Sequence, residues 1–388
     1  MPTAVDYVQE FGNVPFSEKP FCDADNIALC GVFYAHVENV LSDEFEENPK
    51  TLGQVAEELF AYNNHKHIAY GLILPKSISK RLTEMGKQPR YKDLKITACR
   101  TVYSIENTVQ FAAVTVILPD NTAVILYRGT DDTLTGWIED FDLLLKKGIP
   151  SHKLSLDYLN YIAAKHDGNI ILAGHSKGGN IALYAAINCS DEIRERITKV
   201  YNNDGPGFYD YSNFRKPSYN DILPKYRHII PKSSFVGMLL RHDNDYTVVD
   251  SKVPTGLLQH DIASWQIKDG EIVTLPELSF LGKLTDISID SLLTISTWEQ
   301  FEAVYEILCS TLESSGQTSL MGMAKNLRTT VKGIVNNWGE IEDDVKSVFY
   351  RTVGMIAKTV FGSVKEATGK AAEAPEAQPE TTTETATA

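Results

Sequence analysis

The sequence has little positive charge for its length. Its 388 residues carry 37 lysines and arginines against 51 aspartates and glutamates, a formal net charge of −14. Phosphate binding requires clustered basic side chains, so this balance argues against a nucleic-acid partner. The five cysteines lack C-x-x-C spacing, which predicts scattered, mostly buried thiols rather than a disulfide framework or a zinc site.

Long apolar runs and targeting signals are also lacking. No segment reaches the ~18 consecutive apolar residues of a membrane-spanning helix, and residues 1–6 lack the basic and then apolar regions of a signal peptide. These absences predict a cytoplasmic protein. Hydrophobic residues (43%) and charged residues (23%) occur as in ordinary globular proteins, and the length suits one large domain, with or without additions.

The sequence does contain a G-x-S-x-G motif, Gly174-x-Ser176-x-Gly178. The apolar run Ile170 to Ala173 before it predicts a buried strand, and the Ala- and Leu-rich pattern after it predicts a helix. Such a strand-to-helix turn holds a nucleophilic serine in a strained conformation, with glycines where a Cβ atom would clash. It also directs the Lys177 backbone N–H at a developing oxyanion.

Strands and helices alternate through the middle of the chain, which indicates an α/β fold with a mostly parallel central sheet covered by helices. We predict an N-terminal helical region over residues 1–100, an α/β core over 101–285, C-terminal helices over 286–370 and a disordered tail over 371–388. The tail contains only Ala, Glu, Thr, Pro and Gln, so it has nothing to bury. The N-terminal helices, including one expected over 24–41, either cap the site or only pack against the core.

A serine nucleophile needs a base, and the base needs an orienting acid. The base should follow the later strands, which favours His260, and His242 in a polar loop is the reserve. His228 lies within a strand pattern and His175 lies beside the serine, so both are expected to pack or to bond locally.

Two aspartates are candidates for the acid. Asp204 closes the strand after the elbow helix, and Asp245 precedes a short strand nearer to His260 in the sequence. A turn residue and a solvated loop residue are the respective alternatives, so the choice stays open, with Asp204 slightly favoured. The loop Arg128-Gly129-Thr130 follows a further strand, and its N–H together with the Thr130 hydroxyl is expected to supply the second half of an oxyanion hole.

Together these motifs resemble class 3 (fungal-type) lipases over roughly residues 105–270. Tyr127-Arg128-Gly129-Thr130 with Trp137-Ile138-x-Asp140 resembles their oxyanion segment, and Gly174-His175-Ser176-x-Gly178-Gly179 resembles their elbow. The turn from Asp204 to Phe208 and the pair His260 and Trp265 fall where those lipases have a Gly- and Pro-containing turn and the catalytic histidine. More closely, the whole pattern resembles an uncharacterised bacterial α/β-hydrolase family, the Mbeg-like proteins.

The resemblance implies an α/β-hydrolase fold, ester hydrolysis and no cofactor. The sequence pattern adds the N-terminal helices and a C-terminal helical extension, and no metal site is expected. Carried over to this chain, it makes Ser176 the nucleophile, His260 the base, and Thr130 and Lys177 the oxyanion donors.

The chain departs from the class 3 pattern at two places. After the strand at 226–230, where those lipases have their acid, it has Ser233-Ser234, so the acid is Asp204 or Asp245, or is missing. Lys177 replaces the usual apolar residue after the serine and is expected to place a charge near the mouth of the site.

The leading hypothesis is a serine hydrolase of the esterase or lipase type that cleaves a small-molecule or lipid ester through an acyl-enzyme. Thioesterase and acyltransferase activities stay open, because the motifs do not specify the second substrate. The alternative is a catalytically degenerate α/β-hydrolase that acts as a binding or scaffold protein. The oligomeric state is not predicted.

The C-terminal region has a pattern of its own. Apolar residues recur at steps of three or four from Leu320 to Val348, which predicts an amphipathic helix over residues 319–365. Core docking or self-association is one interpretation. Peripheral membrane contact is the other, because basic side chains accompany Trp338 and Phe349.

Overall fold

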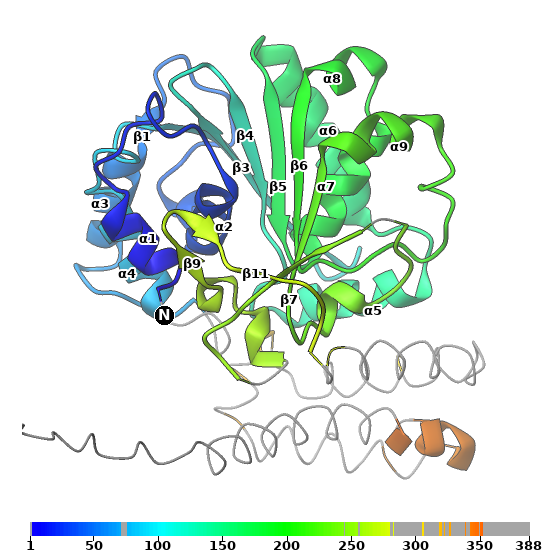
Figure 1. Ribbon diagram of the computed structural model, residues 1–388. Helices are drawn as coiled ribbons and strands as arrows, with labels where there is room; N and C mark the ends of the chain where they lie inside the picture. The colour runs from blue at the N-terminus through cyan, green and yellow to red at the C-terminus, as the bar shows by residue number, and fades with distance from the viewer. Residues whose placement is uncertain are drawn as a thin grey trace, which may run out of the picture.

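The computed structural model describes residues 2–70, 76–243, 245–254, 257–279 and 342–348, and a few other positions between 282 and 351. Its centre is a mixed nine-stranded sheet with helices on both faces, an α/β fold (Figure 1). The strands are β1 Lys50–Thr51, β2 Lys95–Ser104, β3 Val109–Ile117, β4 Ala123–Tyr127, β5 Ile170–His175, β6 Ile197–Asn203, β7 Tyr226–Pro231, β8 Thr247–Val249, β9 Ile267–Lys268, β10 Glu271–Ile272 and β11 Thr274–Leu275. The α-helices are α1 Ala4–Glu10, α2 Asp23–Val32, α3 Leu52–Tyr62, α4 Lys76–Met85, α5 Leu134–Leu145, α6 Pro150–Lys165, α7 Lys177–Asn188, α8 Asp191–Arg196 and α9 Pro217–Ile222.

The strand order of the main sheet is β1-β2-β3-β4-β5-β6-β7-β8-β11. Strands β4 to β8 are parallel, whereas β1 to β4 and the β8–β11 pair are antiparallel. The prediction of a mostly parallel sheet is therefore wrong, since half of the pairings are antiparallel. Connection length is the cause: the turn between β3 and β4 is too short for a crossover, so those strands form the hairpin that the sequence predicted.

Two hydrophobic cores cover the two faces of the sheet. Val124 and Leu126 of β4 pack in the core that contains α2, α3 and α4, whereas Ile125 and Tyr127 pack in the core that contains α6, α7 and α9. Figure 1 shows α1 to α4 on one side of the sheet and α6 to α9 on the other. Successive side chains of β4 thus point into opposite cores, as expected for a strand that is buried on both faces. The N-terminal helices therefore share a core with the sheet, and the boundary expected at residue 100 falls inside β2.

Helices α3 and α4 both fall within the helical region expected over residues 1–100. The long helix expected over 24–41 is wrong, because α2 ends at Val32 and only a 3₁₀ turn, η1 Val37–Asn39, follows. The apolar periodicity continues past Val32, but the chain turns there and brings the hydroxyl of Tyr34 to the ring of His175. A tertiary contact thus overrides the local helical pattern.

Several predictions lie on residues outside the described part of the chain. They are most of the C-terminal helices over 286–370 and of the amphipathic helix over 319–365, where only residues 342–348 and a few single positions are described, and the whole tail over 371–388. In the described ranges, no helix is both long and apolar enough to cross a bilayer. The described cysteines are free thiols, as predicted: Cys22, Cys30, Cys99 and Cys189.

Candidate active site

Ser176 sits on the sharp turn between β5 and α7. Its backbone has φ 59° and ψ −136°, a sparsely populated conformation for any residue with a Cβ atom, and such strain persists only where the surroundings impose it. The Ser176 N–H donates to the Asn203 carbonyl at 3.0 Å. A Cβ atom on Gly178 would lie 2.1 Å from the Tyr127 carbonyl oxygen, so only glycine permits this close approach of α7 to β4.

His260 ends a 3₁₀ turn, η4 Leu257–His260, and its ring meets a buried aspartate. Its Nδ1 lies 2.7 Å from Oδ2 of Asp204. The Asp204 side chain is 0% exposed and that of His260 is 24% exposed. Because Nδ1–H donates to the carboxylate, Nε2 is the basic nitrogen of the neutral ring.

The second oxygen of Asp204 is also hydrogen-bonded. Its Oδ1 accepts from the Ser234 hydroxyl and from the Gly237 N–H, the latter at 3.1 Å. Ser234 lies where the class 3 lipases would have their acid. In this chain its hydroxyl instead donates to the carboxylate of Asp204, which follows the neighbouring strand. Of the two candidate acids, Asp204 is the one that contacts His260, whereas Asp245 is exposed in the loop before β8.

His228 packs locally, as predicted, and the ring that it packs against is that of His242, the reserve base. The ring of His242 stacks on His228 with centroids 4.9 Å apart, and its Nε2 lies 3.1 Å from the Leu239 carbonyl. Burial lowers the pKa of His242 to about 4, so its ring is neutral at pH 7.

The residue before Ser176 contacts His260. The ring of His175, the residue before Ser176, lies 4.5 Å from the ring of His260. Within the described residues, no hydrogen bond joins the Ser176 hydroxyl to His260, and the serine is partly accessible to solvent. Hydrogen bonds between catalytic groups are often long in ligand-free enzymes and shorten only with substrate bound.

The loop after β4 approaches the serine from the opposite side. A Cβ atom on Gly129 would lie 3.0 Å from Cβ of Ser176 and 2.5 Å from the His175 carbonyl oxygen. The Thr130 hydroxyl donates to both oxygens of Asp140, at 2.7 and 2.6 Å. Its proton is therefore directed at Asp140 and not at an oxyanion, contrary to the expected role of this hydroxyl. No hydrogen bond within the described part of the chain uses the N–H of Thr130 or of Lys177.

The side chain of Lys177 is buried, so the expected charge near the mouth of the site is wrong. The ammonium lies 2.7 Å from Glu139, and the two side chains are 1% and 0% exposed. It also donates to the carbonyl and side-chain oxygens of Gln110 at 2.8 and 2.9 Å. The pair joins the first turn of α7 to α5 and β3 beneath the serine.

Sequence reasoning gave no role to Glu139, Ser234 or Tyr34. Glu139 precedes Asp140 in the Trp137-Ile138-x-Asp140 stretch, which was the one available signal for it. Ser234 stood only as a departure from a pattern, and nothing in the sequence around Tyr34 points to His175.

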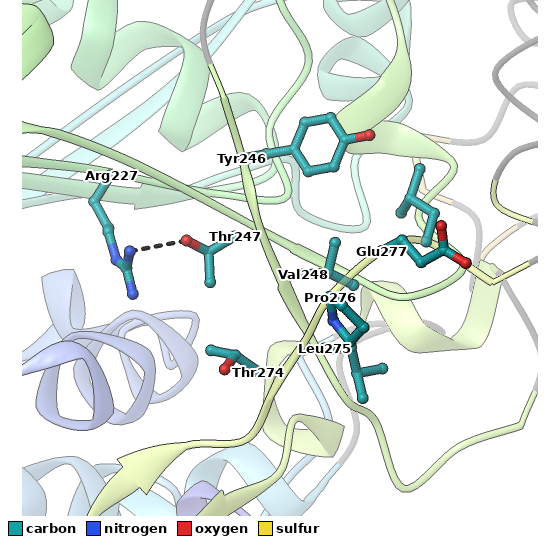
Figure 2. A pocket seen from close by; sticks show the side chains of 9 residues that line it. Arg227, Tyr246, Thr247, Val248, Thr274, Leu275, Pro276 and Glu277 are labelled. Carbon is teal, nitrogen blue, oxygen red and sulfur yellow. Dashed lines mark hydrogen bonds between the residues drawn. The ribbon is translucent and has the colours of Figure 1, made fainter.

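A cavity of about 500 Å³ opens elsewhere, at the edge of the sheet between β7, β8 and β11. Figure 2 shows Arg227 donating to Thr247 at its wall, with Tyr246 and Glu277 at its rim. None of the predicted site residues lines this cavity. Among the described residues, no group of three or more His, Cys, Asp or Glu side chains is arranged to hold a metal ion.

A family model described as Mbeg1-like matches residues 85–309, more than half of the chain. The chain belongs to the Mbeg1-like family. Comparisons with curated proteins and with solved structures gave no match. The segment that matches the Mbeg1-like model contains Ser176, Asp204 and His260, and it begins at the last residue of α4.

Proposed function

We propose that this Mbeg1-like protein is a serine hydrolase with an α/β-hydrolase fold, which cleaves acyl esters through an acyl-enzyme on Ser176. The observation that carries the proposal is the 2.7 Å contact between Asp204 and His260, beside a serine held on a strained strand-to-helix turn. An acid and a base in this order orient the imidazole and stabilise the imidazolium that forms when the base accepts a proton.

In the proposed reaction, Oγ of Ser176 attacks the ester carbonyl while Nε2 of His260 accepts the hydroxyl proton. The N–H groups of Thr130 and Lys177 stabilise the oxyanion of the tetrahedral intermediate. His260 then protonates the departing alcohol and the acyl-enzyme remains. Water, deprotonated by His260, then attacks the acyl-enzyme. His260 returns that proton to Oγ of Ser176 as the acyl–oxygen bond breaks and the carboxylic acid leaves.

The Thr130 hydroxyl has a supporting role in this proposal. Because it donates to Asp140, it fixes the loop whose N–H is the proposed oxyanion donor. The class 3 lipase resemblance supports the same assignment of loop and elbow, and the substrate is proposed to be a small-molecule or lipid ester.

A fluorophosphonate probe tests the proposal, since it labels only an activated serine. Wild type should be labelled, and Ser176→Ala should not be. Hydrolysis of nitrophenyl esters of increasing chain length should depend on Ser176 and on His260 in the same way, and the series would show the preferred acyl length. A wild type that is folded but neither labelled nor active would overturn the proposal.

One observation favours a second candidate, a binding or scaffold protein on a degenerate hydrolase fold. Within the described residues, the Ser176 hydroxyl has no hydrogen bond to His260, so the base is not engaged in the ligand-free state. The same experiment separates the two candidates, because a scaffold predicts no labelling at Ser176 under conditions where Asp204 and His260 are intact.

A further inference from the structure

The turn that carries His260 is held by donors on two successive backbone carbonyls. The indole N–H of Trp265 donates to the carbonyl of Gln259 at 2.8 Å. Nε2 of His175 lies 2.7 Å from the carbonyl oxygen of His260 itself. The residue before the proposed nucleophile therefore contacts the backbone of the proposed base.

Two contacts together select the tautomer of His175. A carbonyl oxygen only accepts hydrogen bonds, so Nε2 of His175 carries the proton while its contact with His260 is formed. Burial lowers the pKa of His175 far below its usual value, so the ring is neutral and Nδ1 is left as an acceptor. The hydroxyl of Tyr34, 2.9 Å from Nδ1, is the group that donates to it.

Tyr34 lies where three parts of the site meet. Its hydroxyl contacts His175 on the elbow strand, and a Cβ atom on Gly129 of the oxyanion loop would lie 2.3 Å from it. Through His175 it is connected to His260. Tyr34 follows α2 in the N-terminal region and lies outside the segment that matches the family model.

We infer that Tyr34 is a positioning residue for His260: it holds His175 in the Nε2–H tautomer, and His175 then fixes the backbone of the base. The inference rests on the proposed function for its catalytic consequence. It also assigns the N-terminal region a role at the site that goes beyond packing against the core.

The test is a double-mutant cycle between Tyr34→Phe and His175→Gln, measured with nitrophenyl butyrate. Tyr34→Phe should lower kcat about tenfold, the equivalent of one lost hydrogen bond, with KM within about twofold. In the His175→Gln background, the amide N–H takes the place of Nε2–H without any tautomer to select. Tyr34→Phe should therefore cost less than about twofold there.

Tyr219→Phe is the matched control, because it removes a buried tyrosine hydroxyl that donates to the Asp243 carbonyl. It should leave kcat unchanged. An equal loss of kcat from Tyr34→Phe in both backgrounds, or no loss in the wild-type background, would overturn the inference in favour of simple packing.

A spectroscopic readout is independent of turnover. In protein labelled with ¹⁵N-histidine, the His175 ring should show Nε2 protonated and Nδ1 unprotonated in wild type, and a mixture of tautomers in Tyr34→Phe. Finding Nδ1 protonated in wild type would refute the inference even if the protein hydrolyses esters. Finding the expected tautomers in a protein without esterase activity would leave the hydrogen-bond chain intact and overturn only the proposed function.

Discussion

Two carboxylates near Ser176 differ in how many hydrogen bonds hold them: Asp204 on the side of the proposed base and Asp140 on the side of the proposed oxyanion hole. On the base side, the carboxylate of Asp204 is fully buried, and three groups donate to it: His260, Ser234 and Gly237. On the oxyanion side, the carboxylate of Asp140 is partly buried and has one donor among the described residues, the Thr130 hydroxyl.

This difference has an electrostatic consequence. Burial raises the pKa of Asp140 to about 6, although the ammonium of Lys177 and the Thr130 hydroxyl oppose the shift. A buried carboxylate with a single donor is ionised at a cost in free energy. The oxyanion side therefore changes charge within an ordinary range of pH.

Asp204→Asn should give the largest effect and breaks the base side directly. An amide at this position cannot hold the imidazole in the tautomer with Nδ1 protonated, and in a serine protease the equivalent change lowered kcat about 10⁴-fold. We expect a similar loss here in nitrophenyl ester hydrolysis. The control is Asp245→Asn, which removes the exposed aspartate and should leave kcat unchanged. The opposite result would mean that Asp245 is the acid.

The elbow could be predicted from the sequence because its determinants are local. The glycines at 174 and 178 and the apolar strand before them lie within ten residues of Ser176, and the structure has the turn in the strained conformation that the motif requires. The Asp-Gly turn between β9 and β10 is determined just as locally, because both of its residues adopt the positive φ that this residue pair favours.

The choice of acid and the state of Lys177 could not be predicted, because both depend on distant partners. Asp204 and Asp245 each lie beside a strand end, and what separates them is the contact of Asp204 with His260, 56 residues away in the sequence. Lys177 is buried because Glu139, 38 residues away in the sequence, lies opposite it. A lone lysine gives no sign of such a partner.

Lys177→Met tests the buried ion pair of Lys177 and Glu139, which supports the oxyanion side. It leaves Glu139 buried without its counter-charge, which typically costs about 3–5 kcal/mol, measurable by urea unfolding. Adding Glu139→Gln should recover part of the loss, since it removes the charge. The recovery should be incomplete, because Glu139 accepts from the backbone N–H groups of Gln110 and Ser151 and an amide has only one accepting oxygen.

Lys153→Met is the control for that experiment. Lys153 also pairs with a carboxylate, that of Asp157, but its side chain is 80% exposed. Exposed pairs contribute roughly 0–1 kcal/mol, so this variant should unfold nearly as wild type does. If Lys177→Met lowered the free energy of unfolding by as little as Lys153→Met does, the buried pair would not be a structural support.

Asp140→Asn should give the smallest effect, and its size should depend on pH. With a folded-state pKa of about 6 and an unfolded value of about 4, the folded protein binds more protons between these pH values. The stability that protonated Asp140 contributes is complete below about pH 4 and is lost as the pH rises through 6. The variant cannot ionise, so the unfolding free energy of wild type should fall relative to it across this window.

Urea unfolding of both proteins at intervals between pH 4 and 7 measures this difference directly. Because the Thr130 hydroxyl donates to the carboxylate and lowers its pKa, Thr130→Val should move the window to higher pH. A difference between wild type and Asp140→Asn that stays constant over the whole range would mean that Asp140 is as firmly ionised as a fully hydrogen-bonded carboxylate. The two sides of the serine would then not differ in the way that their hydrogen bonds imply.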